Sequence, residues 1–61
     1  MPEDNTSARR GALLLDVTQA AAEVGRLVRE ARDLNLPVAP GVRDGRDALV
    51  RWAVLLEEVL P

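Results

Sequence analysis

The chain has 61 residues, with eight arginines, ten carboxylates and a formal net charge of −2, and it contains no lysine, histidine or cysteine. It therefore lacks the commonest general base, any thiolate nucleophile and the usual ligands of zinc. We expect a protein that is not an enzyme and that uses no metal, cofactor or small-molecule substrate. The nearly balanced charge also disfavours nonspecific binding to nucleic acid or to anionic membranes.

The small size of the chain favours association. A domain of about 60 residues buries only about 60% of the surface that its unfolded chain exposes, so it is marginally stable by itself. No disulfide can be formed, and no apolar stretch is long enough to span a bilayer. The polar, acidic start shows no signal-peptide pattern, so the expected location is the cytoplasm.

The first half of the chain predicts a long amphipathic helix. Residues 1–6 are expected to form a disordered tail, and Thr6 or Ser7 can cap a helix over residues 7–35. Apolar residues then recur at alternating intervals of four and three, which indicates a helical seam and not a strand. The seam consists of Leu13, Val17, Ala20, Val24, Leu27, Ala31 and Leu34. A second row beside it consists of Leu14, Ala21 and Val28. An apolar stripe of this width favours a helical bundle over a two-stranded coiled coil.

The second half predicts a turn and a shorter helix. Pro37 ends the first helix, and residues 36–43 form a loop in which Pro40-Gly41 is a turn signal. Asp44 is the expected N-cap of a helix over residues 44–60. Its apolar positions, spaced by three, four and three residues, are Leu49, Trp52, Leu56 and Val59, flanked by Ala48, Ala53, Leu55 and Leu60.

Two helices with a short connection predict an all-α fold, an antiparallel helical hairpin over residues 7–61. The first helix is about 38 Å long and the second about 24 Å at 1.5 Å per residue. On this count the second helix reaches back only to about Thr18, and Leu13, Leu14 and Val17 lack a partner within the chain. We therefore expect two hairpins to pair into a four-helix-bundle homodimer. The predicted interface comprises Leu13, Leu14, Val17, Ala20, Val24, Leu27, Ala31, Leu49, Trp52, Leu56 and Val59.

Charged residues on the first helix offer a different function. Arg26, Arg29 and Arg32 could form a strip that contacts nucleic-acid phosphates. Acidic residues interleave with this strip and no aromatic residue lies near it, so we expect a solvated flank with local ion pairs.

These patterns favour a non-catalytic protein–protein interaction module. We expect a self-associating helical hairpin that acts as an adaptor, a regulator or a small subunit of a larger complex. Its partners would be a second copy of itself and another protein. One alternative is a dimeric nucleic-acid-binding regulator that uses the arginine strip. A second alternative is a docking or assembly segment of a multienzyme complex, which would bind a different chain in preference to itself.

Overall fold

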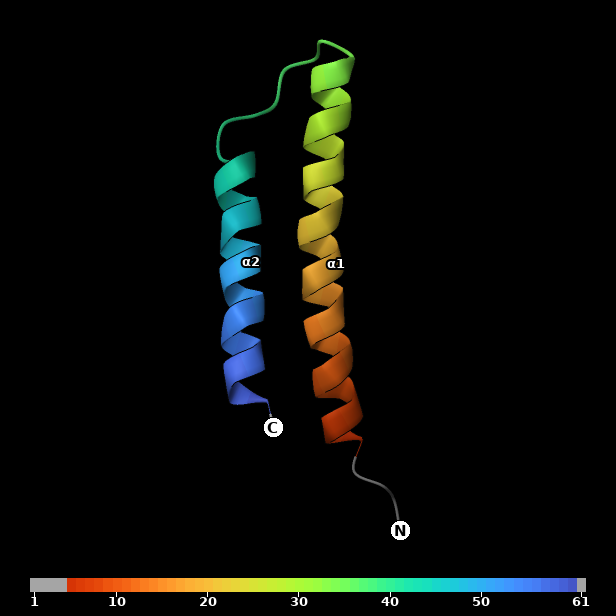
Figure 1. Ribbon diagram of the computed structural model, residues 1–61, viewed down its shortest axis with the longest axis vertical. Helices are drawn as coiled ribbons and strands as arrows, with labels where there is room; N and C mark the ends of the chain where they lie inside the picture. The colour runs from red at the N-terminus through yellow and green to blue at the C-terminus, as the bar shows by residue number, and fades with distance from the viewer. Residues whose placement is uncertain (1–4, 61) are drawn as a thin grey trace.

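The computed structural model describes residues 5–60, and this part of the chain contains two α-helices and no strand. Helix α1 spans Thr6–Asp33 and helix α2 spans Val42–Val59. The two helices lie side by side and run in opposite directions, with the connection at one end and the start of α1 and the end of α2 at the other (Figure 1). The all-α hairpin predicted from the sequence is therefore confirmed for the single chain.

Helix α1 begins earlier than predicted. Thr6 is its first helical residue, and Asn5 occupies the N-cap position without a capping hydrogen bond from its side chain. The backbone N–H of Arg9 donates to the carbonyl oxygen of Asn5 at 2.9 Å, which closes the first turn. Residues 1–4 of the expected disordered tail lie outside the described residues.

The end of α1 is a Schellman motif built on an asparagine. Asn35 has a positive φ of 63°, and its N–H donates to the carbonyl of Arg32 at 3.1 Å. The N–H of Leu36 donates to the carbonyl of Ala31 at 2.8 Å. These two bonds satisfy carbonyls that a helix end leaves free. Pro37 then prevents the helix from continuing, so α1 ends at Asp33, two residues before the predicted boundary.

Replacing Asn35 with glycine is expected to stabilise the hairpin by about 0.5–1 kcal/mol, because glycine adopts a positive φ without a Cβ penalty. Thermal unfolding followed by circular dichroism measures the change. Asn35→Val is the opposing variant, and a β-branched side chain at this φ should lower the midpoint. An Asn35→Gly protein that melts below the wild type would contradict this account of the helix end.

The start of α2 differs from the prediction that Asp44 is its N-cap. The N-cap is Gly41, which has a φ of 91°, and the helix begins at Val42. The N–H of Gly45 donates to the carbonyl of Gly41 at 2.8 Å. Gly41 is suited to this position because it adopts a positive φ directly after Pro40. Asp44 lies instead in the first turn of α2, where the helix dipole favours a carboxylate.

The connection sets the register of the two helices. It descends beside the last turns of α1 before α2 begins (Figure 1). Extended residues advance by about 3.3 Å each, against 1.5 Å in a helix, so a few of them displace α2 by more than one helical turn. As a result Leu60, just after α2, and Leu14 line the same hollow.

This register corrects one expectation from the helix lengths. Val17 is only 4% exposed, which makes it the most buried of the described residues, and Leu14 is half-buried. The prediction that both lack a partner within the chain is therefore wrong. Of the three residues in that prediction, only Leu13 stays exposed.

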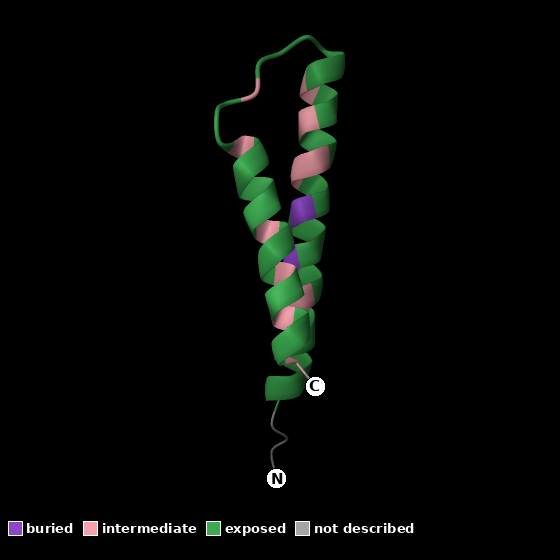
Figure 2. Cartoon of the chain, turned by 60° about the vertical axis from the view of Figure 1, so that its left-hand side comes forward, coloured by how far each residue is buried: buried purple, intermediate pink, exposed green. Residues whose placement is uncertain are grey.

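The core between the helices is thin. Only Val17 and Ala21 are buried among residues 5–60. Half-buried residues continue the line on both helices, and Figure 2 shows them along the facing sides. We call these lines the contact rows: Leu14, Val17, Ala21, Val24, Val28 and Ala31 on α1, and Val42, Leu49, Ala53 and Leu56 on α2 with Leu60 just after it.

Candidate functional site

The predicted seam of α1 divides between two surfaces. Val17, Val24 and Ala31 belong to the contact row, where the second predicted row completes the packing against α2. The remaining positions of the seam lie one behind another, seven residues apart, and are exposed: Leu13, Ala20, Leu27 and Leu34. Two rows on α1 give the same alternating spacing of three and four with Val17, Val24 and Ala31. One is the second predicted row, and the other is the exposed row that begins at Leu13. The spacing alone therefore does not show which row faces α2.

Helix α2 divides in the same way. Leu49 and Leu56 of its predicted apolar positions are half-buried in the contact row. Trp52 is 44% exposed and Val59 is 73% exposed. Together with neighbours at helical spacing they form a second exposed line, which comprises Ala48, Trp52, Leu55 and Val59.

Both exposed lines lie on the same face of the hairpin. Arg46 of α2 lies against Gly25 of α1, and Glu57 lines the same hollow as Gly11. Each helix has two flanks, one on either side of its contact row. Successive residues of a helix are 100° apart, so these four positions lie on one flank and the exposed lines lie on the other. The two remaining flanks therefore meet on the other side of the hairpin. We call that side the apolar face: Leu13, Ala20, Leu27, Leu34, Ala48, Trp52, Leu55 and Val59.

At two levels along the hairpin, a large residue of one helix lies beside a small residue of the other. The pairing of Gly25 with Arg46 and of Leu14 with Leu60 places Trp52 nearly level with Ala20. By the same register Leu27 lies close to the level of Gly45. Such an uneven surface suits interdigitation with a second layer of helices.

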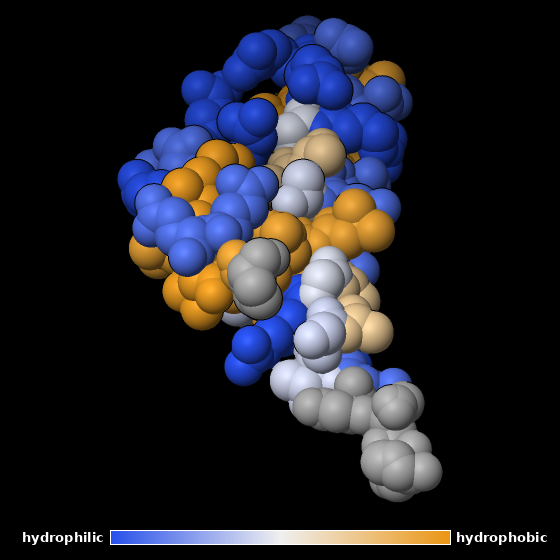
Figure 3. All heavy atoms as spheres, turned by 60° about the horizontal axis from the view of Figure 1, so that its bottom comes forward, coloured by the Kyte–Doolittle hydropathy of each residue, from blue (hydrophilic) through white to orange (hydrophobic). Residues whose placement is uncertain are grey.

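Most of the exposed large apolar residues of the hairpin belong to the apolar face. Ten such residues are exposed among residues 5–60, and six of them lie on this face. Figure 3, turned so that the start of α1 and the end of α2 come forward, shows apolar atoms reaching the surface over α2 and beside its junction with α1. Burial of one leucine or valine side chain is worth about 1.5–3 kcal/mol, so this surface has a large free energy to gain from a partner.

The arginine strip predicted on the first helix is split in the structure. Arg26 pairs with Glu23 through bonds of 2.7 Å and 3.1 Å. Arg29 and Arg32 instead line a hollow beside arginines of α2. The ion pair between Arg26 and Glu23 is well exposed, so it contributes little to stability. Its main effect is that the hydrogen bond from Arg26 lowers the pKa of the Glu23 carboxyl below its ordinary value.

Replacing Arg26 with glutamine is expected to raise the pKa of Glu23 toward its ordinary value. The lowered pKa means that the pair stabilises the helix at neutral pH and that this effect is lost as the pH falls through the pKa of Glu23 in the folded state. NMR titration of the Glu23 side-chain carbonyl measures the shift. Arg9→Gln is a matched control that should leave the Glu23 titration unchanged.

Two other kinds of site are not found in the described part of the chain. No helix there is long and apolar enough to cross a membrane. No group of three or more acidic side chains among residues 5–60 is placed to hold a metal ion.

Comparison of the chain with protein families, curated proteins and solved structures gives no match.

Proposed function

We propose that the protein is a non-catalytic interaction module in which two hairpins pair through their apolar faces to form a four-helix bundle. The single observation that carries this proposal is that the exposed apolar lines of α1 and α2 lie on one side of the hairpin. In the bundle, the two apolar faces and the contact rows beside them would together form one continuous core.

The dimensions of the apolar face favour a second copy as its occupant. From Leu13 to Leu34 it extends for about 31 Å at 1.5 Å per residue. Two helices lying side by side give it a width of roughly 20 Å. A stable interface buries about 800 Å² on each partner, which is close to what a face of this size supplies once its side chains are included. When two copies pack about a two-fold axis, each apolar face meets a surface of the same length and the same apolar character.

A dimer formed in this way leaves the outer surfaces of both hairpins free. Those surfaces carry most of the charged residues, and they are where an additional protein would bind. We propose the role of an adaptor, a regulator or a small subunit on this basis. If the module is instead a docking segment, the apolar face would bind a different chain, and the isolated protein would not pair with itself.

Measurement of the mass in solution tests the proposal. Sedimentation equilibrium at micromolar concentration should give twice the chain mass, and dilution should return the single-chain mass. Trp52 provides a second signal, because its emission should shift to longer wavelength as the dimer dissociates and exposes the indole. A folded helical monomer at micromolar concentration, with unchanged Trp52 emission on dilution, would contradict the dimer.

A further inference from the structure

A basic hollow lies on the side of the hairpin opposite the apolar face. Its volume is about 310 Å³. Two arginines from each helix line it, together with one carboxylate and two apolar residues. The lining consists of Gly25, Val28, Arg29, Arg32, Arg43, Arg46 and Asp47. We call this set the basic hollow.

The arginines of the basic hollow are not neutralised within the chain. Over residues 5–60 the ion pair between Glu23 and Arg26 is the only one formed. Asp47 lines the basic hollow without coming within salt-bridge distance of a guanidinium. Four positive charges and one negative charge thus share a small space, and their mutual repulsion favours the binding of an anion.

Gly25 provides the space for one of these arginines. A Cβ atom at this position would lie 3.1 Å from Nε of Arg46, closer than ordinary van der Waals contact. Glycine is a poor helix former, so its presence in the middle of α1 is consistent with a need for close approach. The guanidinium of Arg46 therefore lies against α1 at Gly25, although the residue as a whole is exposed.

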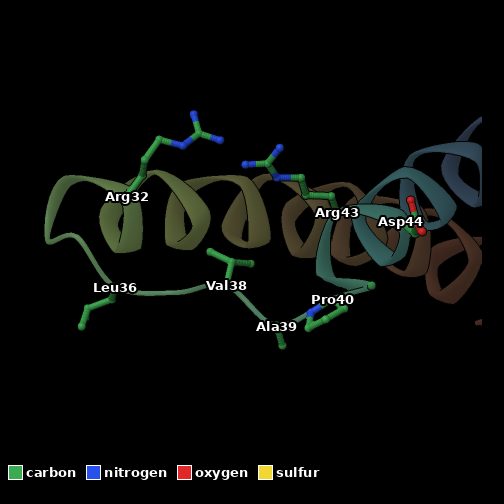
Figure 4. Close-up of a pocket in the computed structure, with 8 residues that line it drawn as sticks. Arg32, Leu36, Val38, Ala39, Pro40, Arg43 and Asp44 are labelled. Carbon is green, nitrogen blue, oxygen red and sulfur yellow. The ribbon is translucent and has the colours of Figure 1, made fainter.

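Two further features place positive charge at this site. Figure 4 shows Arg32 and Arg43 extending toward one another from α1 and from the start of α2. Both also line an adjoining hollow of about 410 Å³ along the connection between the helices, and the carboxylate of Asp44 lines that hollow as well. The first turn of α2 begins here, and the N-terminal end of a helix carries a partial positive charge.

We propose that the basic hollow binds a small, multiply charged oxyanion that carries two or three linked phosphate groups. Guanidinium groups suit this ligand because each offers a planar pair of N–H donors to two phosphate oxygens. The site comes from both helices, so it forms only in the folded hairpin. It faces away from the proposed dimer interface, and each dimer would carry two such sites. The proposal does not depend on dimerisation.

Calorimetric titration with inorganic tripolyphosphate at constant ionic strength tests the proposal. One tripolyphosphate should bind per chain, and the affinity should fall as salt is raised. The double variant Arg32→Gln/Arg43→Gln should weaken binding at least tenfold. The control Arg9→Gln/Arg51→Gln removes the same charge outside the basic hollow, and it should weaken binding less than threefold. Circular dichroism on each variant establishes that the helices are retained.

Other ligands in the same assay identify the source of the phosphate groups. Adenosine triphosphate that binds as tightly as tripolyphosphate would support recognition of the phosphate chain alone. Tripolyphosphate binding no tighter than that of chloride at equal ionic strength would overturn the proposal. Equal weakening by the control variant would also overturn it, because the effect would then come from net charge. A single-stranded oligonucleotide that binds where tripolyphosphate does not would overturn it in favour of a nucleic-acid surface. None of these outcomes changes the mass measured for the dimer.

Discussion

Replacing Leu27 with glutamate is expected to convert the proposed dimer into a monomer. Leu27 lies on the apolar face and is 50% exposed in the hairpin, so the single chain tolerates the change. In the proposed bundle the new carboxylate would be buried without a partner, which costs several kcal/mol. The dissociation constant should therefore rise by at least about 100-fold, since each 1.4 kcal/mol is a factor of ten. Sedimentation equilibrium over a dilution series measures this shift.

Leu15→Glu is the matched control for this variant. Leu15 is 56% exposed on the same helix, but it belongs to neither the contact row nor the apolar face. The substitution is chemically identical, and it should leave the dimer mass unchanged. If Leu15→Glu dissociates the dimer and Leu27→Glu does not, two chains do associate, but through another surface.

Replacing Val17 with aspartate is expected to unfold the hairpin. Val17 is the most buried of the described residues, and a carboxylate there would have neither water nor a partner. The penalty is about 3 kcal/mol or more, which is a large part of the stability of a small domain. Loss of helical ellipticity at 222 nm and a lower denaturation midpoint would record the effect.

Val54→Asp introduces the same charge at a valine of α2 that is exposed and lies outside both lines of that helix. It should change the midpoint by only a few tenths of a kcal/mol, as is usual for surface substitutions. Equal losses from the two variants would show that helix propensity, and not burial between the helices, controls stability.

The sequence predicts the two helices well because their signals are local. Alternating intervals of three and four residues require a helix, and Pro37 requires its end. The boundaries are less certain from sequence, since Asp44 is a good N-cap by type while Gly41 holds that position in the structure. A glycine after a proline can start a helix through its backbone conformation alone. A search for N-cap residues whose side chains form hydrogen bonds does not detect such a start.

The arrangement of the helices depends on features that single-helix patterns lack. The extended connection shifts α2 along α1, and this shift is what buries Val17. The same register brings Arg43 and Arg46 beside Arg29 and Arg32. The sequence pattern predicts a strip only for the arginines of the first helix. The sequence does contain a signal for all four arginines. Arg29 and Arg32 before the connection, and Arg43 and Arg46 after it, are each spaced by three residues and lie at similar distances from it.

The thin core also has a consequence for how the protein behaves at low abundance. With two buried side chains per hairpin, the single chain should be only marginally stable, and pairing in the proposed dimer should add much of its stability. The melting temperature would then rise with protein concentration. In a cell, newly made chains would be open to proteases until enough of them accumulate to meet. The amount of the proposed dimer would therefore rise more steeply than in direct proportion to the rate of synthesis.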